Sequence, residues 1–195
     1  MVMDFRDKEK ALIHTMNQGF HRAAASFCHL INRPVKIFNG QSLLIHQDVD
    51  FSYVSEEEGD LFILITDIIG DISGKSFLIF NEEESNEIFK VLSSSMANDA
   101  FKKAFLMEID NIISASVISE LSNALEVEIY GDVPHLSVVH ARDLQEFMSK
   151  EICKDTPSSF IFCNTMFLFD NKEHVHPQFV WKLSDKVYDL ILARK

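Results

Sequence analysis

The feature that most constrains the fold of this 195-residue chain is that its order of predicted helices and extended segments occurs twice. A long helix is predicted from about Lys8 to about Ile31, because apolar residues recur there at steps of three and four, and extended segments follow it. A second long helix is predicted over 101–125, again followed by extended segments. A repeat of roughly 90 residues indicates that one supersecondary unit is used twice.

Further elements are predicted between and after these helices. Leu61 to Ile69 and Lys75 to Phe80 are expected to be strands that turn at "GDISG", and "EEESNEIFKVLSSSM" is expected to be a helix with acids in its first turn. In the second half, "VEIYGDVP", Leu136 to His140 and "SSFIFCNTMFLFDN" supply strands, and Gln178 to Ala193 is predicted as a closing helix. The segments "FLIFNEEESNEIFKVL" and "MFLFDNKEHVHPQFVWKLSDKVYDL" match as strand, turn and helix.

Two similar halves most simply share one sheet and bury a common core. The predicted fold class is therefore α+β, with long helices packed on a shared, largely antiparallel β-sheet and a pseudo-twofold relation between the halves. One domain is expected over residues 1–195, its first half at about 8–95 and its second at about 101–195. The segment "SSSMANDAF" is the expected linker between them.

Composition excludes several classes of function. The chain has 30 acidic and 18 basic residues, and its net charge of −12 repels nucleic acids and anionic membrane surfaces. Charges near the N-terminus argue against a signal peptide, and the most apolar segment, Leu61 to Ile69, is too short to span a bilayer. Cys28, Cys153 and Cys163 lack metal-like spacing, and their odd number suits reduced thiols. We therefore expect a cytoplasmic protein.

Motifs for other chemistries are weak. His14, His21 and His29 lie at steps of seven and eight on the first helix, but no carboxylate at helical spacing completes a metal site. "GDISG" lacks the Gly-Lys-Ser/Thr ending of a phosphate loop, and no Gly-x-Ser-x-Gly occurs. We expect the lone Trp181 to be a core-packing residue of the last helix.

One strip of the second long helix holds the candidate site. At about 100° per residue, Glu108 and Asn111 lie roughly 60° apart, close enough to act together. Large apolar residues occupy the rest of this helix. The same strip otherwise carries small residues, which allow a partner to approach closely: Ala104, Ala115, Ser119 and Ser122. The spacing alone is common in amphipathic helices, so it does not decide between a site and an ordinary polar face.

The sequence resembles the CheC/CheX/FliY family, phosphatases of the chemotaxis response regulator CheY. The family motif is Asp or Ser, three residues, Glu, two residues, Asn, then 22 residues and Pro, and Glu108, Asn111 and Pro134 stand at that spacing. "GDISGKSFLIF" resembles the family's first strand pair, and the resemblance extends from about residue 12 to about residue 190. Ala104 departs from the motif. In the first half His14 replaces the Glu while Asn17 remains, which makes that second site degenerate.

The resemblance implies a phosphatase that hydrolyses the aspartyl-phosphate of a CheY-like response regulator. It implies that Asn111 orients the attacking water and that Glu108 pairs with the regulator's lysine. The chain would need no cofactor of its own, since the Mg²⁺ belongs to the phosphorylated partner. Single-site members can dimerise, which leaves a homodimer open. The alternative is a non-enzymatic adaptor that binds or sequesters a regulator or another signalling protein, because a fold does not guarantee an activity.

Overall fold

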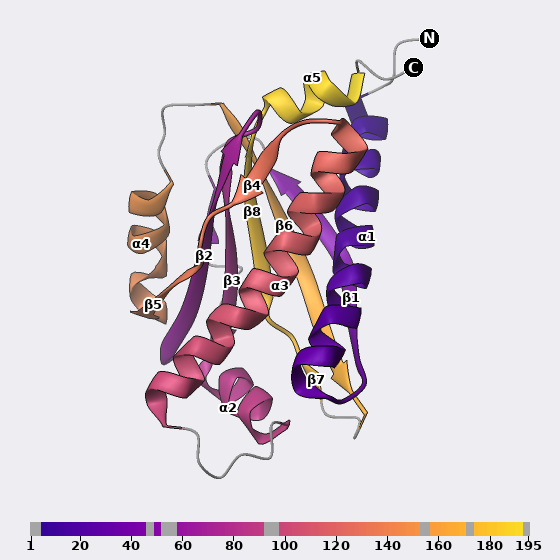
Figure 1. Cartoon of the computed structure of the whole chain (residues 1–195). Coiled ribbons are helices and arrows are strands. Elements are labelled where there is room, and N and C mark those ends of the chain that lie inside the picture. The colour runs from indigo at the N-terminus through magenta and orange to yellow at the C-terminus, as the bar shows by residue number, and fades with distance from the viewer. Residues whose placement is uncertain are drawn as a thin grey trace.

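The computed structural model describes residues 5–45, 49–51, 58–91, 98–152, 157–170 and 174–192 (Figure 1). The first half contains one long helix, three strands and a short helix: α1 (Phe5–Ile31), β1 (Val35–Ile45), β2 (Asp60–Gly70), β3 (Gly74–Asn81) and α2 (Glu82–Val91). The second half repeats this order with insertions: α3 (Asp99–Leu125), β4 (Ile129–Gly131), β5 (His135–His140), the 3₁₀ turn η2 (Ala141–Asp143), α4 (Leu144–Glu151), β6 (Ser158–Phe169), β7 (His174–Val175), β8 (Gln178–Ser184) and α5 (Lys186–Leu192).

The strands of the two halves interleave in one eight-stranded sheet. The order is β1-β6-β8-β3-β2-β4, with β5 also paired to β2 and β7 to β6, and the pairs are antiparallel. This order is symmetric about the central β3–β8 pair, because β1, β6 and β8 mirror β4, β2 and β3. The predicted α+β class, with two similar halves sharing one sheet, is confirmed.

Helices α1 and α3, each of 27 residues, lie side by side on one face of the sheet (Figure 1). Their backbones approach closely at Gly19, where an added Cβ would lie 2.5 Å from the Cα atom of Val117. Arg22 of α1 and Glu120 of α3 form an ion pair across the same crossing. The apolar side chains of both helices join the main core with the facing residues of the sheet. Helix α3 is therefore held rigidly on its inner side.

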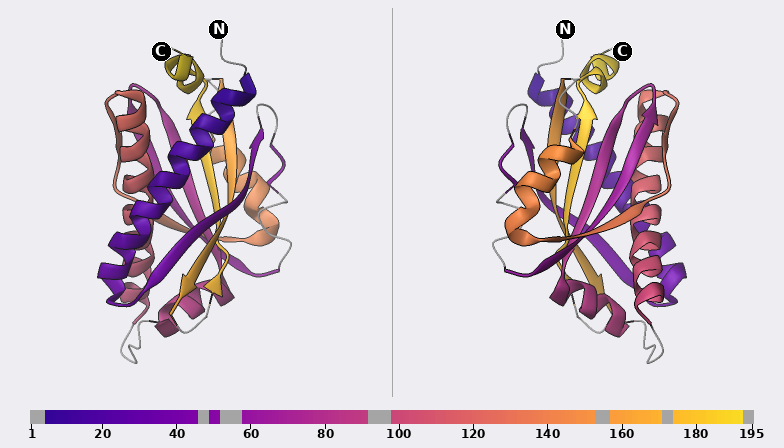
Figure 2. Two further views of the ribbon diagram at one scale, coloured as in Figure 1. Left: turned by 90° about the vertical axis from the view of Figure 1, so that its right-hand side faces the viewer. Right: turned by 90° about the vertical axis from the view of Figure 1, so that its left-hand side faces the viewer.

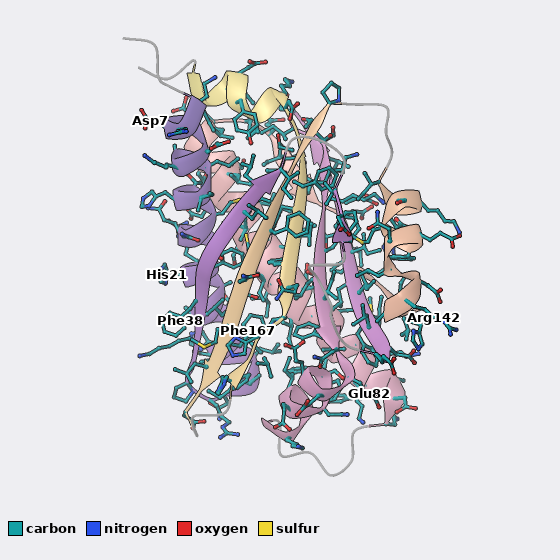
Figure 3. All side chains as sticks on the ribbon, turned by 180° about the vertical axis from the view of Figure 1, so that it is seen from behind. Asp7, His21, Phe38, Glu82, Arg142 and Phe167 are labelled. Atoms are coloured by element: carbon teal, nitrogen blue, oxygen red, sulfur yellow. The ribbon has the colours of Figure 1, made fainter. Side chains whose placement is uncertain are left out.

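Helix α4 covers the opposite face of the sheet (Figure 2). Leu144 and Met148 of this helix pack with Phe51 and with the outward-facing strand residues in a second core. Figure 3 looks onto this face, with Arg142 marking the start of α4 on one side and Phe38 marking the edge strand β1 on the other. In the part of the chain that the structure describes, no helix is long and apolar enough to cross a membrane.

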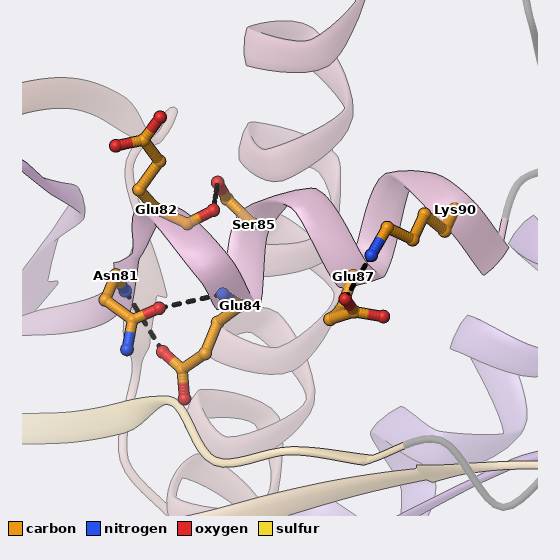
Figure 4. Close-up of polar contacts among 6 residues, drawn as sticks. All are labelled: Asn81, Glu82, Glu84, Ser85, Glu87 and Lys90. Atoms are coloured by element: carbon orange, nitrogen blue, oxygen red, sulfur yellow. Dashed lines mark hydrogen bonds and ion pairs between the residues drawn. The ribbon is translucent and has the colours of Figure 1, made fainter.

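Helix α2 begins with a reciprocal capping arrangement (Figure 4). The backbone N–H of Glu84 donates to Asn81 Oδ1 at 2.8 Å, and the N–H of Asn81 donates to Glu84 Oε2 at 3.0 Å. Two of the N–H groups that a helix start leaves without helical partners are thereby satisfied. The acids of the first turn were predicted from the sequence, and Ile88 on the inner side of this helix is buried.

Two expectations for the end of the chain are wrong. Gln178–Ser184 is strand β8, and the closing helix is only Lys186–Leu192. Because β8 lies at the centre of the sheet, both of its faces are buried, so its apolar run lacks the alternation that marks a strand. The counterpart of β3–α2 is consequently β8–α5, and not the segment that begins at Met166 in β6. Trp181 is fully buried, but on β8 instead of the last helix.

Other expectations fall partly outside the described residues. Residues 93–97, which make up most of the proposed linker, are outside the described ranges, and so is Cys153. The described part resumes at Asn98, whose side chain caps α3 by accepting a hydrogen bond from the N–H of Phe101 at 2.9 Å.

Candidate functional site

Most of the strip predicted on α3 is exposed, and only Ser122 at its end is half-buried. Five of its residues, at steps of three or four, are open to solvent: Ala104, Glu108, Asn111, Ala115 and Ser119. The rest of the helix is flanked by α1 on one side and by β4 on the other, where an added Cβ on Gly131 would lie 2.9 Å from Ile118 Cδ1. The exposed strip is therefore narrow, and its small residues leave Glu108 and Asn111 as its projecting polar groups.

Glu108 and Asn111 make no hydrogen bond or ion pair with any other residue in the described ranges. The carboxylate of Glu108 and the amide of Asn111 are thus available to a partner. A hollow of about 270 Å³ beside the start of α3 is lined by residues of α2, α3 and β2, including Phe89 and Lys102, but not by this pair. The geometry suits contact with the surface of another macromolecule better than enclosure of a small molecule.

The corresponding residues of α1 are arranged differently. Asn17 is only partly exposed, and its Oδ1 accepts a hydrogen bond from Asn39 Nδ2 of β1 at 2.7 Å. His14 is exposed, with its Nε2 lying 3.4 Å from Gln18 Nε2. The side-chain oxygen of Asn17 thus already accepts a hydrogen bond within the protein, whereas among the described residues that of Asn111 does not. The first half therefore differs from the second in the partners of its amide, and it has His14 where the second half has the carboxylate of Glu108.

Pro134 is buried between β4 and β5. The segment that leads to it is fixed at several points: Asp132 N–H donates to Asp67 O of β2 at 2.9 Å, and Gly131 packs against Ile118 of α3 and Thr66 of β2. The 22 residues between Asn111 and the proline thus span the rest of α3 and return along its flank. Pro134 therefore lies beside the strip and is not part of it.

A cluster of buried polar residues lies beneath the strip, and the sequence reasoning missed it. Asp110 accepts hydrogen bonds from Thr66 Oγ1 of β2 at 2.6 Å and from Ser114 Oγ of α3 at 3.0 Å. Ser114 Oγ also lies 3.2 Å from Ser76 Oγ of β3, and Ser76 is the register partner of Thr66. Asp110 is 0% exposed. Asp110 and Ser114 fall among apolar residues on the helical wheel, and this is the signal in the sequence that marks them.

Burial raises the pKa of Asp110 to about 6, although the hydrogen bonds from Thr66 and Ser114 act in the opposite direction. The charged neighbours Asp67 and Lys75 on β2 and β3 pair with each other at 3.2 Å, and Lys75 also pairs with Glu151 of α4 at 3.0 Å on the opposite face. Asp110 is thus a buried carboxyl group that has hydroxyl donors and no cationic partner in the described part of the chain.

An exposed aromatic residue begins the strip. Phe101 is 47% exposed and lies one turn before Ala104. Its ring stacks on Phe105, with 6.2 Å between centroids and 8° between planes, and Phe105 in turn contacts Phe89 of α2. This stacking holds the Phe101 ring in place while leaving one side open to a partner.

The other candidate chemistries gain no geometric support within the described residues. No group of three or more His, Cys, Asp or Glu residues there is arranged to hold a metal ion. Cys28 and Cys163 are free thiols. Burial raises the pKa of Cys163 to about 12, so its thiol is protonated and unreactive at neutral pH.

Comparison with models of protein families gives no match, and no curated protein matches the sequence. The fold, however, is found in solved structures. FliY from Thermotoga maritima is 14% identical, with 100% of both chains covered and a TM-score of 0.73. FliM in the FliG–FliM complex from H. pylori is 9% identical, covering 98% of this chain and 100% of that one, with a TM-score of 0.61. The chemotaxis protein CheX from Desulfovibrio desulfuricans is 16% identical, covering 91% and 97%, with a TM-score of 0.51.

The chain therefore has the fold of the CheC/CheX/FliY proteins, which confirms the resemblance at the level of the fold. The match extends over the whole chain, so both halves and the helix that carries Glu108 and Asn111 belong to the shared architecture.

Proposed function

We propose that the protein is a phosphatase of a CheY-like response regulator, acting through the exposed face of α3. The observation that carries the proposal is the pair Glu108 and Asn111, both solvent-exposed and unpartnered within the described residues, on a strip of small side chains in a FliY- and CheX-like fold. The substrate would be the phosphoryl group on the regulator's aspartate. The products would be inorganic phosphate and the free regulator.

Asn111 has the chemistry to position the attacking water. Its Oδ1 accepts a hydrogen bond from water and its Nδ2 donates one, and the neutral amide does not repel the phosphoryl group. The water oxygen forms its bond to phosphorus as the bond from phosphorus to the aspartate oxygen breaks. A Mg²⁺ ion held by the regulator would supply the charge neutralisation, so this chain would contribute mainly the position of the water.

Glu108 would anchor the complex. It lies one helical turn from Asn111, and its exposed carboxylate pairs with no cation of the described residues. Pairing with the lysine of the regulator's active site would fix the register between the two proteins. Loss of Glu108 should therefore weaken binding as well as reduce the rate.

The test is release of phosphate from each CheY-like regulator of the same organism, phosphorylated with acetyl phosphate in the presence of Mg²⁺. We expect the wild-type protein to accelerate release, and Asn111→Ala to lose about a hundredfold or more of that acceleration. Asn123→Ala is the matched control, since it makes the same change at another exposed position of α3. Full activity in Asn111→Ala would refute the assignment of this site.

A second candidate function is an adaptor without activity. Two observations favour it: Ala104 stands where the family motif has Asp or Ser, and FliM, solved in complex with FliG, has the same fold. An adaptor would bind a regulator without accelerating loss of its phosphate, and Asn111→Ala would leave binding unchanged. Measuring binding to the same phosphorylated regulators, beside phosphate release, separates the two functions.

A further inference from the structure

The cluster beneath the candidate site contains the only buried carboxyl group for which the described structure shows hydroxyl donors alone as partners. Asp110 lies between Glu108 and Asn111 in sequence but points into the protein. It stands among apolar side chains in the face that α3 presents to the sheet. A buried charge without a cation is costly, and residues that break a local rule in this way are concentrated at functional sites.

The geometry of the cluster defines what Asp110 can do. Asp110 and Ser114 lie one turn apart on α3, directly over Thr66 and Ser76, which face each other across β2 and β3. Apolar contacts alone permit a helix to rotate or slide slightly on a sheet. Two hydrogen bonds join this part of α3 to the sheet, from Thr66 to Asp110 at 2.6 Å and between Ser114 and Ser76 at 3.2 Å, and because they are directional they fix both the rotation and the height of the turn that carries Asn111.

Thr66 also connects this turn to the flank of the site. It is one of the two residues of β2, with Asp67, that lie between the segment that pairs with β5 and the segment that pairs with β4. Its methyl group lies against Gly131, in the segment that leads to Pro134. The Thr66 side chain therefore contacts both neighbours, α3 through its hydroxyl and the segment that leads to Pro134 through its methyl group.

We propose that Asp110 is a positioning residue for the hydrolysis, which it serves by locking α3 to β2 through Thr66 so that Asn111 holds the water in line. This inference rests on the proposed function. Displacements of about 1 Å at a reacting group can reduce a rate a hundredfold, so a hydrogen bond below the site can affect turnover strongly. Binding of the regulator depends on the exposed strip and should change little.

The decisive experiment compares Thr66→Ser with Thr66→Val in the phosphate-release assay. Serine keeps the hydroxyl that donates to Asp110, and valine removes it while keeping the shape of the side chain. We expect Thr66→Ser to retain wild-type kcat within about twofold and Thr66→Val to lose about tenfold or more, with KM for the phosphorylated regulator within about twofold of wild type in both. Urea titrations under assay conditions confirm that each variant is folded.

Asp110→Asn supplies an independent readout. The ionised carboxylate is the form that accepts both hydroxyls, so wild-type kcat should rise between pH 5.5 and 7.5 relative to Asp110→Asn, following a midpoint of about 6. Asp143→Asn, an exposed change on the other face of the sheet, controls for loss of one charge. Equal kcat in Thr66→Ser and Thr66→Val, or the same pH profile in wild type and Asp110→Asn, overturns the inference while Asn111→Ala remains inactive. A wild-type protein that accelerates no regulator overturns the proposed function, and this inference with it.

Discussion

The buried Asp110 predicts an unusual dependence of stability on pH, which can be measured without any partner. Its pKa is raised from 3.8 to about 6 in the folded protein because the carboxyl group is completely buried. Folding therefore favours the protonated form. The contribution of Asp110 to stability is fully present below pH 4 and is lost as the pH rises through about 6.

The magnitude follows from the shift of the pKa. A rise of about 2 units, at about 1.4 kcal/mol per unit, corresponds to ~3 kcal/mol of stability lost between pH 4 and pH 7. Asp110→Asn keeps the shape of the side chain and its polar atoms but does not ionise. The variant should accordingly gain up to ~3 kcal/mol over wild type as the pH rises through this range, then keep that advantage at higher pH.

Urea denaturation of both proteins from pH 4.5 to 8 measures this difference, and the other carboxylates of the chain cancel in the comparison. Asp143→Asn, whose carboxylate is exposed, should show no such trend. A free-energy difference between Asp110→Asn and wild type that is the same at pH 4.5 and at pH 7.5 would show that Asp110 is not a buried ionised group, and the reasoning about the cluster would fail.

Two further predictions test the packing of α3 and the open end of its strip. Gly19→Ala should lower the free energy of unfolding by about 1–3 kcal/mol, because the new Cβ would lie 2.5 Å from the Val117 Cα. Gly40→Ala is the control, since its new Cβ would lie 3.5 Å from the nearest atom, and it should change the free energy by less than about 0.5 kcal/mol. Urea denaturation measures both values, and equal effects would contradict the close crossing of α1 and α3. If the strip docks a regulator, Phe101→Ala should raise KM for the phosphorylated regulator about tenfold and leave kcat unchanged. Val138 on β5 is similarly exposed, and Val138→Ala should leave KM unchanged. An unchanged KM in Phe101→Ala would show that Phe101 is not part of the docking surface.

The architecture was largely predictable from the sequence because its signals are local. The periodicity of α1 and α3 and the strand pair at "GDISG" depend on neighbouring residues, and the repetition of the pattern indicated a shared sheet. Strand β8 was mistaken for a helix since a centrally placed strand is buried on both faces. That burial is a property of the sheet order, which no local pattern records.

The candidate site was predictable only in part. The strip on α3 was visible in the spacing of Glu108 and Asn111, and the structure shows both residues exposed. The proposed role of Asp110 depends on Thr66 and Ser76 of the β2–β3 pair, and Thr66, 44 residues away in the sequence, meets Asp110 only because α3 packs on these strands. The hydrogen bond between Asn17 and Asn39, which distinguishes the two halves, likewise depends on how β1 folds back along α1.

The interleaved sheet has a consequence for the half that carries no intact motif. Its strand β1 pairs with β6, its strand β2 carries both β4 and β5, and its helix α1 forms one wall of α3. Neither half encloses a core without the other, so the first half cannot be deleted even where its own residues do no chemistry. The first half therefore serves the candidate site through packing alone, because it supplies the strands and the helix against which α3 is held.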